Sequence, residues 1–160
     1  MLRIIMLFML AALMLTGCGT GTADNSRQEQ IPDNASAVTA GKKVLMKFAD
    51  GQGVLLLNDS QAAKNLYAML PLQLSFKDFN HTEKISYPPR SIHEGLHPEG
   101  HQPVSGDLCI YAPWGNLCIF YRDYKMSGDL FYLGHLDAAG IRLLTDKQED
   151  FTVELIRAEQ

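Results

Sequence analysis

Three histidines recur at a four-residue interval in one polar stretch: His93, His97 and His101, with Glu94 and Glu99 between them. Zinc accepts imidazole and carboxylate ligands, so the spacing raises the hypothesis of a metal site. Two glycines and a proline interrupt the stretch and prevent the helix that would place the three imidazoles on one face. A zinc site would therefore need the loop to wrap around the ion. The alternative, which we expect, is a solvated loop without a cofactor.

Two cysteines flank a turn signal that contains a proline and a glycine. If the turn spans Ala112–Gly115, Tyr111 faces Asn116, and Cys109 then lies opposite Cys118 on the neighbouring strand. An oxidising compartment would permit a disulfide between them, although a cross-strand bridge has strict geometric requirements. The alternative, which we expect, is a pair of buried free thiols that act as small hydrophobic side chains.

Aromatic and arginine side chains near the same turn are the best candidates for ligand binding. Aromatic rings give a large apolar contact area, and an arginine adds a contact for an anion. The alternative is that most of these rings fill the core, which suits Trp114 least because the tip of a hairpin seldom lies at a core's centre. The predicted ligand-binding residues are Trp114, Tyr87, Arg90, Tyr121 and Arg122, with Tyr124 and Phe131 as neighbours.

No complete catalytic motif occurs in the 160 residues. A nucleophile elbow, a glycine-rich phosphate loop and a Cys-x-x-Cys pair are all missing from the sequence. The formal net charge of −4 and the lack of a basic patch exclude nucleic acid as a partner. A hydrophobic content of 46% supports a single globular domain. We expect a binding protein whose partner is a small molecule, a peptide or an envelope protein.

The first 17 residues have the layout of a secretory signal: Arg3 precedes an apolar run from Ile4 to Leu15. At 1.5 Å per residue the run spans roughly 18 Å, short of the roughly 30 Å of a bilayer core. Leu15-Thr16-Gly17-Cys18 matches the lipobox of bacterial lipoproteins, which implies cleavage before Cys18 and attachment of palmitate-type acyl chains to it. The alternative is an ordinary signal peptide that happens to contain a cysteine.

Residues 18–40 form the predicted anchor and tether. After Cys18 the chain is rich in Gly, Thr, Ser, Asn, Asp and Gln, and its apolar residues show almost no periodicity. A flexible segment of this length has a root-mean-square reach of roughly 25 Å. Two or more acyl chains anchor a protein stably. We therefore expect an exported protein on the cell membrane or, because Gly19 follows the cysteine, on the periplasmic side of the outer membrane in a two-membrane host.

The folded domain is predicted over residues 41–160, around the hairpin Gly106–Tyr121. Both alternating sets of residues in its two apolar runs are hydrophobic, which is typical of strands buried on both faces. Further strands are expected at Lys43–Phe48, Val54–Leu57, Leu72–Phe76, Glu83–Tyr87, Leu130–Leu136 and Phe151–Leu155, and helices at Gln61–Leu70 and Ala138–Leu144.

The connections complete this pattern. The glycines of Asp50–Gly53 are expected to take positive φ in a tight turn, and Arg90–Ser105 is a long loop of the kind that often carries binding groups. The count is seven or eight strands with two short helices, and the strands do not alternate with helices as in βαβ units. This pattern predicts a mainly β fold, a small closed barrel.

Four segments carry a resemblance to a known family: Glu83–Pro88, Gly106–Leu108, Ala112–Leu117 continuing into Ile119–Tyr121, and Leu133–Leu136. With them, the chain from about Lys43 to Arg157 resembles the bacterial cyclophilin-like fold family, whose small barrels are distinct from the proline isomerases. The resemblance implies a barrel capped by short helices with a cleft on one side. It also implies a domain that binds a ligand or partner without established catalysis.

Two alternatives follow from the same resemblance. A diverged peptidyl-prolyl isomerase would need the arginine of a Phe-His-Arg strand, which is missing, so Arg90 in its loop is the remaining catalytic candidate. An accessory to a flavodoxin-like redox partner is the other alternative, since similar domains are sometimes joined to flavodoxin-like ones. This chain has no flavin-binding segment of its own.

Overall fold

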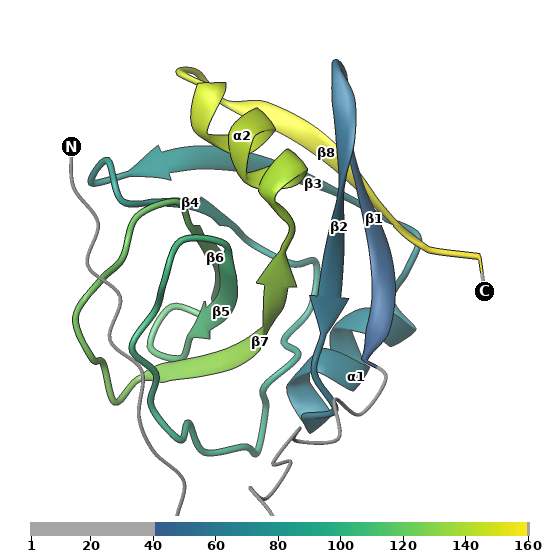
Figure 1. Cartoon of the computed structure of the whole chain (residues 1–160). Coiled ribbons are helices and arrows are strands. Elements are labelled where there is room, and N and C mark those ends of the chain that lie inside the picture. The colour runs from purple at the N-terminus through teal and green to yellow at the C-terminus, as the bar shows by residue number, and fades with distance from the viewer. Residues whose placement is uncertain (1–40, 160) are drawn as a thin grey trace, which may run out of the picture. The chain divides into compact units, whose positions relative to one another are not determined.

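The computed structural model describes residues 41–159, so the predictions for the signal peptide, Cys18 and the tether lie outside the described residues. The described chain forms a closed barrel of eight strands in the order β1-β2-β7-β5-β6-β4-β3-β8, with two helices (Figure 1). The strands are β1 (Lys42–Phe48), β2 (Gly51–Leu57), β3 (Leu72–Phe79), β4 (Glu83–Ser86), β5 (Asp107–Tyr111), β6 (Asn116–Phe120), β7 (Leu130–Leu136) and β8 (Phe151–Arg157). The helices are α1 (Gln61–Ala68) and α2 (Ala138–Asp146). The predicted mainly β, small closed barrel with two short helices is confirmed.

Every pair of neighbouring strands is antiparallel, and β1 closes the barrel by pairing with both β2 and β8. Closure leaves no edge strand with unpaired backbone groups. Alternation along each strand then separates an inner from an outer face. In β3, for example, Leu74 and Phe76 are buried inside while Gln73 and Ser75 are exposed.

The turn between β1 and β2 differs from the prediction. Phe48 pairs with Gly51, so the reversal uses Ala49 and Asp50, and the following glycines lie in β2 without positive φ. Gly53 has another role, because a Cβ there would collide with the backbone of Gly140 in α2. The absence of a side chain lets the helix pack directly on the strand.

Each helix begins with a side-chain cap. The Ser60 hydroxyl accepts a hydrogen bond from the Ala63 amide at the start of α1, and Asp137 accepts one from the Gly140 amide at the start of α2. The two helices lie toward opposite ends of β2 (Figure 1). None of the described helices has the length and apolar character needed to cross a membrane.

The hairpin of β5 and β6 has the predicted register: Tyr111 pairs with Asn116, and Cys109 with Cys118. It is buried on both faces. Leu108, Ile110, Leu117 and Ile119 belong to the main core of the barrel. The other face joins a second cluster on the outside of the sheet, formed by Cys109, Cys118, Phe120, Ile85 and Leu130. The second cluster needs its own cover, which two loops provide.

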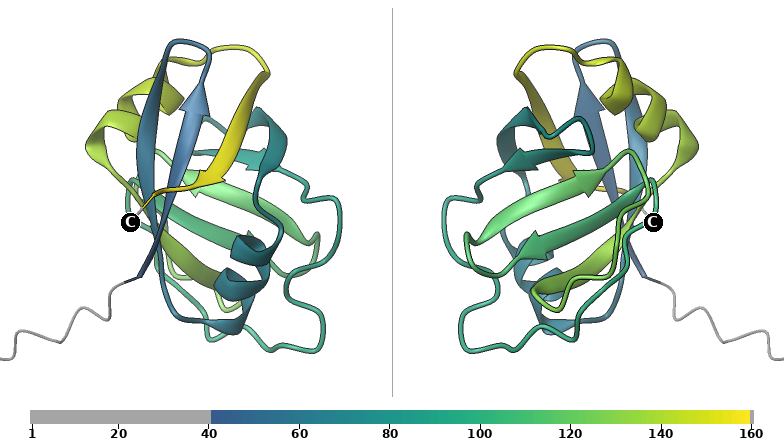
Figure 2. Two further views of the ribbon diagram at one scale, coloured as in Figure 1. Left: turned by 90° about the vertical axis from the view of Figure 1, so that its right-hand side faces the viewer. Right: turned by 90° about the vertical axis from the view of Figure 1, so that its left-hand side faces the viewer.

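The long connection between β4 and β5 extends on the side of the barrel away from α2 (Figure 2). The shorter connection between β6 and β7, residues 122–129, is called the rim segment below. The two are joined by backbone hydrogen bonds between His101 and Ser127 in both directions, at 3.0 and 2.9 Å, and by one from the Tyr124 amide to the Pro103 carbonyl at 2.9 Å. The rim segment is thus held against the outer face of the sheet.

Candidate functional site

A pocket of about 280 Å³ opens on this outer face, between the sheet and the rim segment. Its floor consists of Glu83 and Ile85 from β4 with Asn116 and Phe120 from β6. Strand pairing explains this set, because Glu83 lies opposite Phe120 in the antiparallel register. Alternation sends the intervening Lys84 into the barrel.

Three aromatic rings form one wall of the pocket. Trp114 meets Phe79 with ring centroids 5.6 Å apart and Tyr111 with centroids 5.4 Å apart, nearly perpendicular in both cases, at 89° and 85°. The tight turn places the indole there: Gly115 takes a φ of 67°, which a glycine adopts without strain, and its amide donates to the Tyr111 carbonyl at 2.9 Å. Such edge-to-face pairs fix the wall's shape.

The rim segment supplies the opposite wall. Tyr124 stacks on Phe120 with centroids 6.0 Å apart, and Met126 lies beside it at the mouth. Trp114, Tyr124 and Met126 are 52%, 43% and 59% exposed, although they are large apolar side chains. Exposed apolar residues gathered around one opening are typical of a binding site.

The polar side chains at the floor of the pocket are Asn116 and Glu83. Asn116 is 2% exposed; its Nδ2 donates to the Leu117 carbonyl at 3.2 Å, whereas its Oδ1 is buried without a hydrogen-bond partner. Burial raises the pKa of Glu83, and a hydrogen bond from the Cys118 thiol offsets part of the rise. The Cys118 thiol also lies 3.5 Å from the Cys109 carbonyl oxygen, and its single proton serves one acceptor at a time.

The two cysteines lie directly beneath the pocket. Both are fully buried and are free thiols in this structure, so the disulfide stays a prediction that a thiol count would test. Burial and the nearby carboxylates of Asp107 and Glu83 raise the pKa of Cys109, and burial and Glu83 raise that of Cys118. The thiolate is the reactive form, so neither sulfur is suited to nucleophilic chemistry.

Of the predicted ligand-binding residues, the structure places only Trp114 in this pocket. Tyr87 lies on a separate shallow surface with Leu72 and Pro89, and Arg90 on another beside Asn65. The neighbour Phe131 lines a second cavity, with His97. The predicted set is therefore dispersed over the barrel.

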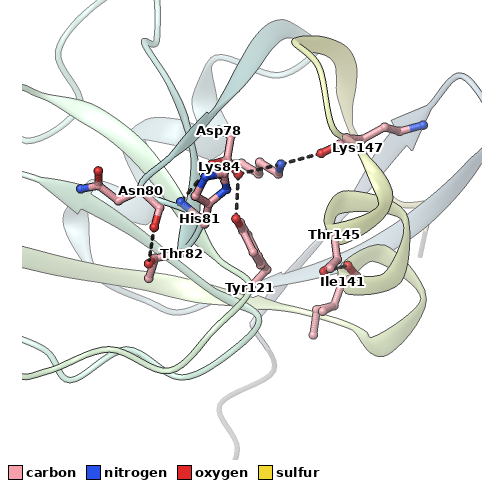
Figure 3. A network of polar contacts seen from close by, with 9 residues as sticks. All are labelled: Asp78, Asn80, His81, Thr82, Lys84, Tyr121, Ile141, Thr145 and Lys147. Atoms are coloured by element: carbon pink, nitrogen blue, oxygen red, sulfur yellow. Dashed lines mark hydrogen bonds and ion pairs between the residues drawn. The ribbon is translucent and has the colours of Figure 1, made fainter.

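Tyr121 is not part of the pocket lining. Its side chain points into a polar network that joins β3, β4 and the chain after α2 (Figure 3). Its hydroxyl donates to Asp78 at 2.7 Å, and burial together with this bond raises the pKa of Tyr121 to about 12. Lys84, 3% exposed, donates to Asp78 at 2.9 Å and to the Lys147 carbonyl at 2.6 Å. Arg122 lies near the Tyr121 ring, 5.9 Å from its centroid. This network ties elements of the barrel together.

The three histidines of the sequence hypothesis do not converge. His93 approaches Gly115 and Phe131, whereas His101 Nε2 lies 2.7 Å from an Asp107 carboxylate oxygen and its ring stacks on Tyr132. Within residues 41–159 no group of three His, Cys, Asp or Glu side chains is placed to hold a metal ion. The zinc hypothesis at this loop therefore has no support in the geometry.

Asp107 instead forms the centre of a His-Asp-His cluster. Its Oδ1 contacts His135 Nδ1 at 2.9 Å, whereas Oδ2, the oxygen beside His101, accepts a hydrogen bond from the Val104 amide at 3.0 Å. Burial alone would raise the pKa of Asp107, but the bonds from His135, Val104 and His101 outweigh it and hold the pKa below its usual value. The cluster fixes the end of the long loop, and with it the rim segment.

Comparison with known proteins supports the fold. The sequence matches the Cyclophilin-like family over residues 46–156. A hypothetical protein from Archaeoglobus fulgidus, whose structure was determined in solution, superposes with a TM-score of 0.58 at 12% identity, over 74% of this chain and 96% of that chain. At this identity the likeness shows the fold alone. No curated protein matches the chain.

Proposed function

This chain belongs to the cyclophilin-like family, and we propose that its barrel binds a small ligand, or one side chain of a larger partner, in the pocket beside Trp114. One observation carries the proposal: the buried Asn116 Oδ1 has no partner at the floor of an aromatic pocket. A buried acceptor without a hydrogen bond costs roughly 1–3 kcal/mol. A ligand that donates to this oxygen would recover that cost.

The pocket is built for binding rather than turnover. Its lining contains no nucleophile next to a general base, and the thiols beneath it are held protonated. Arg90, the candidate for isomerase chemistry, lies outside the lining. An isomerisation assay on a proline peptide should show the uncatalysed rate for both the wild type and Arg90→Ala, and a wild-type rate that Arg90→Ala lowers would contradict a purely binding role.

We further propose that the domain works at a membrane surface of the cell envelope, anchored through Cys18. The support is the Leu-Thr-Gly-Cys motif at the end of an apolar segment. Labelled palmitate fed to the host should appear in the wild type and be lost in Cys18→Ser, which should also leave the membrane fraction. A Cys18→Ser protein that stays with the membrane would argue against the lipid anchor.

The pocket itself is tested by native mass spectrometry of the protein purified from its own host. We expect a retained small molecule or peptide that is lost in Trp114→Ala. Tyr87→Ala is the matched control, because Tyr87 is an aromatic residue of similar exposure, 55% against 52%, outside the pocket. No retained mass, or equal retention in the two variants, would contradict the proposal.

A further inference from the structure

The hydrogen-bonding groups at the floor of the pocket call for a donor. Asn116 Oδ1 is unpaired, whereas the Asn116 amide nitrogen donates to the Leu117 carbonyl. Glu83 forms no ion pair with any residue in the described part of the chain. A ligand with N–H groups can serve both acceptors, whereas a carboxylate or phosphate would add a third acceptor to the same floor.

The charges around the pocket favour a cation. The charged side chains in the lining are Glu83 at the floor and Asp129 and Lys125 at the rim. Lys125 is exposed, with its ammonium 5.9 Å from the Tyr124 ring centroid, so water screens it. The partly buried Glu83 carboxylate is screened less, and it carries the stronger field inside the pocket.

The walls suit the same ligand. The faces of tryptophan, tyrosine and phenylalanine rings attract ammonium groups, most strongly where water is excluded. Trp114 meets Phe79 and Tyr111 nearly at right angles, so the aromatic wall is not one flat stack. Aromatic walls next to a carboxylate form the kind of site that holds an organic cation.

The size limits the ligand. A volume of about 280 Å³ is near the lower end of small-molecule pockets, about 300 Å³. It admits one ring or a short alkyl stem. A free amine and the side chain of a lysine in a peptide share this chemistry.

Resting on the proposed binding function, we infer that the pocket takes an ammonium group carried on an apolar stem, with its N–H groups on Glu83 and Asn116 and its stem against Trp114. The ionised carboxyl is the binding form. Binding therefore weakens as the pH falls through the pKa of Glu83, which burial places above the usual glutamate value.

The test is a titration of the full-length protein followed by the emission of Trp114, the only tryptophan in the chain. Benzylammonium is compared with benzyl alcohol, which has a similar shape and no charge. We expect the ammonium to bind at least tenfold more tightly, equivalent to about 1.4 kcal/mol. Glu83→Gln should bring the two affinities together, and Glu94→Gln, which removes the same charge from an exposed loop site, should leave the ratio unchanged.

The source of the ammonium is resolved with a capped lysine peptide and its norleucine counterpart. A preference for the lysine peptide over free benzylammonium indicates a protein partner, and the reverse preference indicates a free amine. If the wild type binds the charged and the neutral compound equally, the inference is overturned, but the proposed binding function of the pocket is not. This comparison uses the wild type alone, so it does not depend on the folding of a variant. If neither compound changes Trp114 emission while a ligand from the host does, the ammonium class is wrong. If no ligand of any kind does, the proposed function fails too.

Discussion

Asn116 has a buried carbonyl oxygen without a partner, beside the one partly buried carboxyl group of the pocket, Glu83. Two other buried polar side chains are satisfied: Lys84 donates to two acceptors, and Asp107 contacts two histidine ring nitrogens and one backbone amide. In the described chain, His93 Nδ1 is the other buried side-chain atom without a hydrogen-bond partner. Of the two, Asn116 lines the pocket, and an unsatisfied acceptor there fits the proposed role in binding, since unpaired buried groups occur where function opposes stability.

Asn116→Leu tests whether Asn116 lowers the stability of the fold and contributes to ligand binding. The leucine removes the unpaired oxygen and keeps a similar volume, so the free energy of unfolding should stay the same or rise by up to about 1 kcal/mol. Benzylammonium affinity should fall at the same time, because one acceptor is lost. Urea unfolding and the Trp114 titration measure the two effects. A less stable variant with unchanged affinity would show that Asn116 is structural.

Asp78 gives a pH-dependent prediction. Burial acts to raise its pKa, but the hydrogen bonds from Tyr121, Lys84 and the His81 amide prevail, and the pKa falls below the usual 3.8. A carboxyl with a lowered folded-state pKa stabilises the fold above its unfolded pKa and loses that effect as the pH falls through the folded value. The stability advantage of wild type over Asp78→Asn should therefore shrink as the pH drops below 3.8. Urea unfolding at several pH values checks this, and a constant difference would contradict it.

At the scale of elements, the periodicity of the sequence located the strands well because alternation is a local property. The β5–β6 hairpin followed from two apolar runs and a Pro-Gly turn, and its register matches the prediction. The prediction for the β1–β2 turn was wrong for a physical reason. Gly51 and Gly53 read as turn residues, but Gly53 is needed for the close approach of α2, a contact between segments distant in the sequence.

For a strand that is buried on both faces, it is harder to predict which residues point into the barrel and which point outward. Asn116 and Phe120 share the outer face of β6, whereas Leu117, Ile119 and then Tyr121 turn inward. Apolar residues occupy both faces of β6, so alternation alone does not show which face a residue takes, and the predicted Tyr121 lies outside the pocket while Phe120 lines it.

The contact between β2 and α2 gives a prediction at this scale. In Gly53→Ala the new methyl group would collide with Gly140 and push the helix away from the strand, which should cost about 1–3 kcal/mol. Gly128→Ala is the control, since a Cβ there meets no atom within 4 Å. Thermal unfolding of both variants measures the difference. Equal melting temperatures would mean that α2 accommodates the methyl group.

At the scale of the whole molecule, the barrel brings together residues that lie far apart in the sequence. The pocket draws on β3, β4, β5, β6, β7 and the rim segment, and the strand order places β4 beside β6 rather than β5. That order is set by closure of the barrel and is not encoded in any short stretch. For this reason the fold class and the aromatic tip at Trp114 could be predicted, while Glu83 and Asn116 could not.

The central claim is that this outer face binds a ligand, and the most direct measurement is NMR mapping of backbone amides during a titration with benzylammonium. We expect the largest shift changes at Glu83, Asn116, Phe120 and the rim segment, which line the pocket, with little change in β1 and β8 across the barrel. Changes centred on β1 and β8, or none at saturating ligand, would contradict the account.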